Sequence, residues 1–276
     1  MYRKWAKVFA IVALVVFLAG CFSSSWTIRL KKDGSGTIRM EYKMDKQVMA
    51  MIQGMGGGEG AVPDTSEEFL SESDLDELAA AMGEGVRVVS AEPIPENEQS
   101  FGYIAVFEFD DINTLAIDPM EGAPESSGDG METEAEEAPF TFQFTRGATP
   151  ELTVFMEQED DEDGEFADDE FAEMEDTQAE QQQNEQMAEM MKPYFRSMSF
   201  DVKIEFDGRI RDTNATYRDG NTVTLVDMDM GKIIDNDELF KAVINDGDLQ
   251  DEEMIAKLEK AGIQVESQDS IFVRFR

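Results

Sequence analysis

Histidine is absent from this chain of 276 residues, and Cys21 is the single cysteine. The lack of histidine excludes Ser-His-Asp and Cys-His catalysis and removes the usual ligands of zinc and copper. One cysteine cannot form a disulfide within the chain. Any metal site would have to consist of oxygen ligands, which suit calcium, magnesium or manganese.

Basic residues are scarce. The chain has 23 Lys and Arg against 61 Asp and Glu, which gives a formal net charge of −38. Such a charge repels nucleic acid and anionic lipid surfaces, and it attracts divalent cations and basic proteins. We therefore expect no nucleic-acid partner. A solvated acidic surface, or a saline habitat, is the simpler explanation of the charge.

Long apolar runs are missing too. The run from Val8 to Leu18 has 11 residues, whereas a membrane-spanning helix needs about 20. Three basic residues precede it, and Leu18-Ala19-Gly20-Cys21 completes it. This layout is typical of an export signal. It predicts that residues 1–20 are a signal peptide that is cleaved between Gly20 and Cys21.

Leu18-Ala19-Gly20-Cys21 resembles the lipobox of bacterial lipoproteins. The resemblance implies that Cys21 receives an S-diacylglyceryl group, becomes the new N-terminus and is N-acylated. Two or three acyl chains anchor a protein stably, because each buried methylene contributes about 0.8 kcal/mol. Phe22 stands where aspartate signals inner-membrane retention in many Gram-negative lipoproteins, so the resemblance favours the outer membrane if the organism has one. The sequence leaves open whether the protein lies on the periplasmic face or on the outer face of that membrane.

The rest of the chain alternates between strand and helix patterns. Segments of period two predict strands, at residues 26–30, 37–42, 86–89, 101–109, 140–144, 152–156, 199–206, 209–217, 222–227 and 271–275. Segments with a helical stripe or helix caps predict helices, at residues 44–55, 71–82, 177–191, 237–244 and 251–261. Strands 199–206, 209–217 and 222–227 are expected to form an antiparallel meander. The fold class is therefore α+β, an antiparallel sheet of hairpins and meander covered by amphipathic helices.

Composition also predicts the domain limits. Residues 21–25 are expected to be a short lipidated tether, and residues 26–276 one ectodomain. Two acidic segments are too polar to bury a core, at about residues 120–138 and 157–176. We expect them to be flexible, or helical in part.

A methionine-rich stripe lies in the predicted helix of residues 44–55. Its members fall on one helical face, and they are Met44, Val48, Met51, Ile52 and Met55. Methionine side chains adapt to irregular partners, so the stripe could form an apolar groove for a ligand. The alternative is that it simply faces the core. A second methionine-rich stretch, at residues 187–191, could cover the same sheet.

The segment Glu159 to Glu170 approximates a calcium-binding loop. Asp161, Asp163 and Glu170 would supply oxygen ligands, and Gly164 stands at the sixth position, where such a loop turns sharply. The first position is glutamate where aspartate is usual. A merely solvated acidic run is the alternative. No cofactor is expected apart from this candidate calcium ion.

Two groups of turn residues resemble the LppM-type family of bacterial surface lipoproteins. One is Trp26-Thr27-Ile28-Arg29-Leu30 with Asp33-Gly34-Ser35-Gly36-Thr37. The other is Asp207-Gly208-Arg209-Ile210 with Thr213-Asn214-Ala215 and Asp219-Gly220-Asn221-Thr222-Val223. The resemblance implies an α+β ectodomain without enzymatic activity that is suspected of binding lipid.

Three hypotheses follow. The first is a non-enzymatic, lipid-anchored envelope protein that binds a lipid or another apolar ligand. The second is a scaffold or interaction protein in an envelope complex, whose acidic insert faces a basic partner. The third is a calcium binder or a metal-dependent enzyme.

Overall fold

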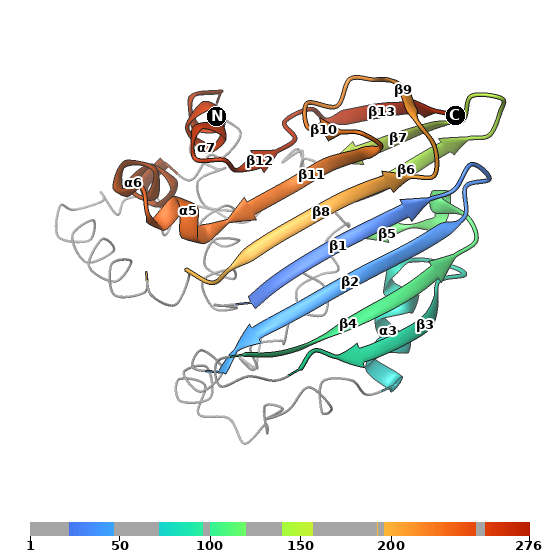
Figure 1. The fold of residues 1–276 in the computed structure, drawn as a ribbon, viewed down its shortest axis with the longest axis horizontal. Coiled ribbons are helices and arrows are strands. Elements are labelled where there is room, and N and C mark those ends of the chain that lie inside the picture. Colours follow the sequence, from blue (N-terminus) through green and yellow to red (C-terminus); the bar gives the residue numbers. More distant parts are fainter. Residues whose placement is uncertain are drawn as a thin grey trace, which may run out of the picture.

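The structure is a computed structural model that describes residues 22–46, 72–95, 100–119, 140–156, 192, 196–246 and 252–276. The chain forms two β-sheets, which pack against each other, and a small group of helices at one end (Figure 1). Each sheet takes strands from both the N-terminal and the C-terminal part of the described chain.

The larger sheet has the strand order β10-β11-β8-β1-β2-β4-β3, with β12 paired to β11. Its strands are β1 (Phe22–Leu30), β2 (Gly36–Asp45), β3 (Arg87–Pro93), β4 (Ser100–Phe109), β8 (Ser199–Phe206), β10 (Arg218–Asp219), β11 (Thr222–Asp229) and β12 (Gln264–Val265). β1 is central, antiparallel to β2 and parallel to β8. Figure 1 shows these strands running side by side from β11 to β3.

The smaller sheet has the order β5-β6-β7-β13-β9. Its strands are β5 (Ala116–Ile117), β6 (Phe140–Thr145), β7 (Glu151–Met156), β9 (Ile210–Thr213) and β13 (Ser270–Phe275). All four pairings in this sheet are antiparallel. The last strand of the chain therefore lies inside the sheet and not at its edge.

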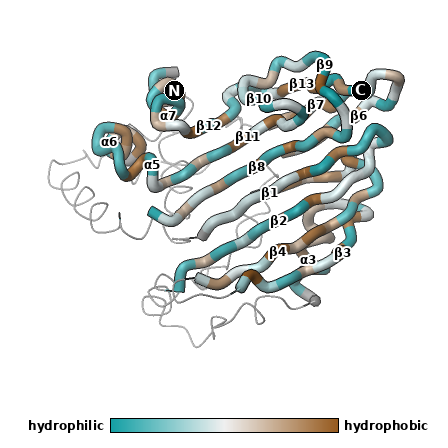
Figure 2. The backbone as a smooth tube through the Cα atoms, in the orientation of Figure 1, coloured by the Kyte–Doolittle hydropathy of each residue, from teal (hydrophilic) through white to brown (hydrophobic). Residues whose placement is uncertain are grey.

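The main core lies between the two sheets. Side chains of β1, β2, β4 and β8 alternate between buried and more exposed positions, so one face of the larger sheet is apolar. Teal and brown alternate accordingly along β2, β8 and β11 in Figure 2. Phe206 of β8 and Phe275 of β13 are buried, and their rings lie 4.9 Å apart. Trp26 of β1 is also fully buried, and its indole N–H donates to Ser24 Oγ at 2.8 Å.

The helices occupy two places. α3 (Glu72–Met82) packs beside β3 and ends at Gly83, whose φ of +139° disfavours other residues. α5 (Met230–Ile234), α6 (Asp237–Asp246) and α7 (Glu252–Lys260) enclose a second core with Met198 and Ile263. A short 3₁₀ turn, η1 (Ile112–Thr114), follows β4.

Most of the expected strands and helices are present, but their assembly differs from the prediction. The parallel pairing of β1 with β8 makes the larger sheet mixed. The expected meander is wrong at its middle strand, because β9 leaves β8 and pairs with β13 in the second sheet. The face that was expected to lie under helices is covered by that second sheet. Residues 22–25 belong to β1 and do not form a separate tether.

Candidate functional site

The two ends of the larger sheet differ in character. We call the end where β1 begins the anchor end, because Phe22 directly follows Cys21 in the chain. We call the opposite end, with the β1–β2, β8–β9 and β10–β11 turns, the far end. β1 has nine residues, so at about 3.3 Å per residue the ends are roughly 30 Å apart. In Figure 1 the helices α5–α7 and the C-terminus lie at opposite ends.

The predicted groove residues are only partly described. Met44 lies in β2 and not in a helix, and its side chain is buried in the core between the sheets. The helical prediction for Met44 is therefore wrong, since the strand period of β2 continues as far as Asp45. Val48, Met51, Ile52 and Met55 lie outside the described residues, as does the stretch 187–191.

The other predicted sites also lie outside the described residues. They are the lipidation and cleavage residues Cys21 and Gly20, the candidate calcium ligands Asp161, Asp163 and Glu170, and the two segments expected to be flexible, 120–138 and 157–176. Within the described ranges, no group of three or more Cys, Asp or Glu residues could hold a metal ion. No helix in those ranges is long and apolar enough to cross a membrane.

The anchor end brings together segments that are distant in sequence. Phe22 pairs with Met44, and Ser23 pairs with Ser199. The hydroxyl of Ser199 donates to that of Ser23 at 2.9 Å. The start of β1, the end of β2 and the start of β8 therefore lie together at this end of the larger sheet.

The outer face of the larger sheet carries ion pairs between neighbouring strands. Arg29 of β1 donates to Glu205 of β8 at 2.7 Å, and Lys203 of β8 pairs with Asp201 and Asp227. Glu41 of β2 accepts from Arg39 and Lys43, which lower the pKa of its carboxyl group. These side chains are half-buried or exposed. The face is thus polar and internally neutralised, in a chain whose overall charge is strongly negative.

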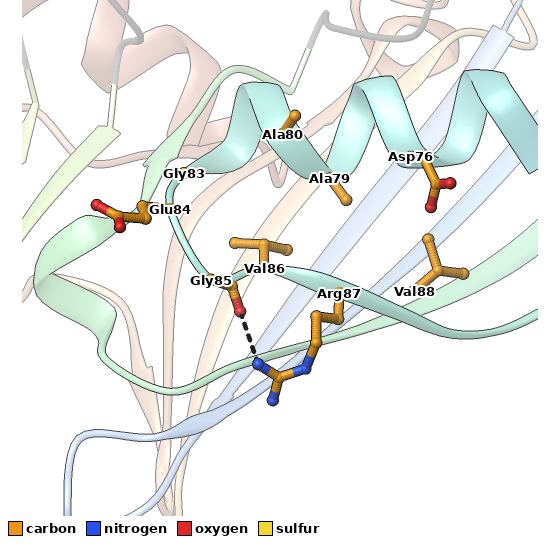
Figure 3. A pocket seen from close by; sticks show the side chains of 9 residues that line it. All are labelled: Asp76, Ala79, Ala80, Gly83, Glu84, Gly85, Val86, Arg87 and Val88. Atoms are coloured by element: carbon orange, nitrogen blue, oxygen red, sulfur yellow. Dashed lines mark hydrogen bonds between the residues drawn. The ribbon is translucent and has the colours of Figure 1, made fainter.

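A groove of about 510 Å³ lies between α3 and β3 (Figure 3). It is lined by Asp76, Ala79, Ala80, Gly83, Glu84, Gly85, Val86, Arg87 and Val88. Arg87 makes a bidentate contact with Asp110 at 3.0 and 3.1 Å and a further bond with Glu108 at 3.2 Å. These bonds raise the pKa of Arg87 and lower that of Asp110. Because the acids already neutralise Arg87, the groove offers little attraction to an anion.

Sequence reasoning did not identify this groove. The signal that could have found it is Gly83-Glu84-Gly85, a tight connection from a helix to the next strand. Gly83 faces the backbone there, since a Cβ would lie 2.0 Å from the carbonyl oxygen of Thr114. This close approach brings α3 and β3 beside η1.

A tyrosine pair in the core gives the fold a pH dependence. Tyr42 and Tyr103 stack with ring centroids 5.6 Å apart. Burial, and to a smaller extent the negative charge of Asp74, raise the pKa of Tyr103 from 10.0 to about 12. Burial likewise raises the pKa of Tyr42. A raised folded-state pKa favours the native state below the unfolded pKa, and this stabilisation is lost as the pH rises toward the folded pKa.

We therefore expect Tyr103 to make the protein less stable in alkali. At pH 11 its contribution to the free energy of unfolding should be about 1 kcal/mol lower than at pH 8. Urea unfolding of the wild type and of Tyr103→Phe at both pH values measures this difference. The variant should lose less stability between the two pH values, and equal losses would contradict the assignment.

The comparisons with known proteins give one match. No family model matches the chain, and no curated protein sequence is significantly similar to it. Among solved structures, the folded domain of LppM from Mycobacterium tuberculosis is similar at a TM-score of 0.33 and 9% identity. The match covers 93% of this chain and 91% of that domain. The resemblance is weak, and no function of this chain is inferred from it.

Proposed function

We propose that this chain is a non-enzymatic, lipid-anchored protein of the bacterial cell envelope that binds a lipid or another apolar molecule near the membrane. The observation that carries the proposal is the strand register at the anchor end. The start of β1, the end of β2 and the start of β8 share this end of the larger sheet. In the sequence, Cys21 directly precedes β1, one methionine-rich stretch follows β2 and the other precedes β8. Methionine side chains suit a deformable apolar contact. An acyl-modified Cys21 would hold them at the bilayer surface.

The anchor is tested by Cys21→Ala. We expect this variant to lose all incorporation of radiolabelled fatty acid and to remain an uncleaved precursor, because no other thiol can form the thioether. Ser25→Ala is the matched control, since it changes a nearby small side chain and leaves the lipobox intact. Normal processing and membrane attachment of Cys21→Ala would overturn the anchor.

The orientation of the larger sheet relative to the membrane is tested with thiol probes. If Cys21 is lipidated, an introduced cysteine is the only free thiol in the mature chain. Lys43 and Thr37 lie on the same outer face of β2, six residues apart, which corresponds to about 20 Å. A fluorophore on Lys43→Cys, near the anchor end, should be quenched by spin-labelled lipid headgroups. The same fluorophore on Thr37→Cys should be quenched much less. Equal quenching would contradict a sheet whose anchor end faces the membrane and whose far end points away from it.

The ligand is tested by native mass spectrometry of the full lipidated chain released from detergent. We expect a non-covalent lipid adduct in addition to the covalent acyl chains. Met51→Glu with Ile52→Glu should remove that adduct, whereas Gln53→Glu adds a charge beside the stripe and should keep it. A wild-type chain without any adduct would count against a lipid ligand.

A second candidate function has its own observation in its favour. The outer face of the larger sheet is broad, polar and ion-paired, which suits a protein partner in an envelope complex. Crosslinking through a photoreactive group at Thr27, on that face of β1, tests it. Reproducible capture of one envelope protein would support a scaffold role, and the same experiment from Thr153 on β7 is the control.

A further inference from the structure

A second open pocket, of about 650 Å³, lies at the far end of the larger sheet. We call it the far-end pocket. It lies between the β8–β9 turn and the β10–β11 turn, and Phe206, Asp207, Gly208, Arg209, Arg218, Gly220 and Asn221 line it. In Figure 1 the β1–β2 turn lies at this same end. The pocket is thus a full strand length from the start of β1.

The pocket contains two arginines that no Asp or Glu side chain of the described residues neutralises. Among the described residues, Arg29, Arg87 and Arg274 all form ion pairs with acids. Neither Arg209 nor Arg218 forms an ion pair within the same described ranges. The pocket lining holds one carboxylate, that of Asp207. Two unneutralised guanidinium groups beside one acid are unusual in a chain with 61 acidic residues.

Backbone carbonyls orient the guanidinium of Arg218. Its Nε donates to Gly220 O and its Nη2 donates to Ile210 O, each at 3.3 Å. These carbonyls carry no net charge, so Arg218 keeps its full positive charge. A guanidinium has five N–H donors, and the two bonds leave three of them for a ligand. The loss of side-chain entropy on binding is also smaller for a side chain that is already held.

A third cation approaches from the β1–β2 turn. Lys32 Cε lies 3.2 Å from the position that a Cβ on Gly208 would occupy, and the main-chain oxygen of Arg276 lies 2.8 Å from it. Glycine at position 208 therefore lets three chain segments meet at the pocket. Two backbone bonds between Arg209 and Arg276, both of 3.0 Å, fix the β8–β9 turn against the end of β13.

We propose that the far-end pocket binds a phosphate group. Arginine forks match the oxygens of phosphate in pairs, and such charge-assisted bonds are about twice as strong as neutral ones. A phosphate monoester carries up to about two negative charges and three strong acceptor oxygens, which suit two arginines and Lys32. A ligand with a single carboxylate group carries only one negative charge and therefore matches three cations less well than a phosphate monoester does. The proposal depends on these residues alone and holds whether or not Cys21 is acylated.

Calorimetric titration of the full chain in detergent, without divalent cations, tests the site. Inorganic pyrophosphate serves as a soluble probe, and glycerophosphoglycerol represents a phospholipid headgroup. We expect saturable binding of at least one probe, weakened by added salt. Arg209→Gln with Arg218→Gln should weaken that binding at least tenfold. If only pyrophosphate binds, the ligand is a soluble phosphate, and if the headgroup probe binds, a lipid source is supported.

Arg211→Gln is the matched control. Arg211 is an exposed residue of β9 at the same end but outside the pocket lining. Its loss should change the affinity less than twofold. Loss of the two Arg218 hydrogen bonds in the double variant could disturb folding. Arg209→Gln alone keeps these bonds, so it should weaken binding while the melting temperature stays unchanged. The proposal is overturned if neither probe binds saturably, if the double variant binds as the wild type does, or if Arg211→Gln weakens binding equally.

Discussion

Phe275→Ala is expected to lower the free energy of unfolding by about 4 kcal/mol, within the range for truncation of a buried phenylalanine. Phe275 is fully buried in β13, with ring centroids 4.9 Å from Phe206 and 6.2 Å from Phe144. The cavity would open where the two sheets meet, and the strands around it are fixed by their hydrogen bonds. The site can therefore relax only slightly, which is why the cost should not fall to the lower end of the range.

Urea unfolding of both proteins measures this effect. Phe155→Ala is the matched control, because Phe155 lies on the adjacent strand β7 and is 39% exposed. It should cost about 1–2 kcal/mol, clearly less than Phe275→Ala, since 39% of its surface already contacts water. Similar losses for the two variants would mean that the sheets do not pack through Phe275.

Glu266→Ala is expected to cost about 3 kcal/mol, the second largest effect. Glu266 is a buried carboxylate in the connection between β12 and β13. Its oxygens accept from the backbone N–H and the hydroxyl of Thr216 at 2.7 and 2.8 Å, and from Ser267 and Gln268 at 3.2 Å. Removal of this buried carboxylate takes away the shared acceptor of four donors, whose hydrogen bonds are part-buried.

Glu266→Gln separates charge from shape in this prediction. The amide has nearly the same size but offers one acceptor oxygen instead of two, so it should recover only part of the loss. Glu259→Ala is the control, since Glu259 is exposed and accepts a single bond from Tyr217. Thermal unfolding ranks the stability of the three variants, and Glu266→Ala should be the least stable. A Glu266→Ala protein as stable as the Glu259→Ala control would refute the role of this carboxylate.

Local patterns predicted most of the strands and helices. The alternation from Trp26 to Leu30 and from Thr37 to Tyr42 gave the first hairpin, and Gly83 ended α3 as expected. These features depend on neighbours two to four residues away, so a single sequence contains their signals. Met44 shows the limit, because a stripe of helical spacing began on a residue that the strand still includes.

The pairing of the strands could not be predicted from the sequence to the same extent. Alternation shows that Ile210–Thr213 has a buried side, but it does not say which sheet supplies the cover. The parallel contact between β1 and β8 joins residues 176 positions apart in register, such as Ser23 and Ser199. The far-end pocket has the same origin, since Lys32 comes from the β1–β2 turn, Arg209 from the β8–β9 turn and Arg218 from β10.

The sequence by itself determined the lack of histidine chemistry, the strongly acidic charge and most of the individual strands, and it predicts an export signal with a lipidation site at Cys21. Each of these depends on composition or on residues close together in the chain. Only the tertiary structure decided that there are two facing sheets, that β1, β2 and β8 share the anchor end, and that Arg209 and Arg218, which form no ion pair with a described residue, line one pocket at the far end. These depend on which apolar faces cover each other, and burial of apolar surface favours any well-fitting partner regardless of its distance in sequence.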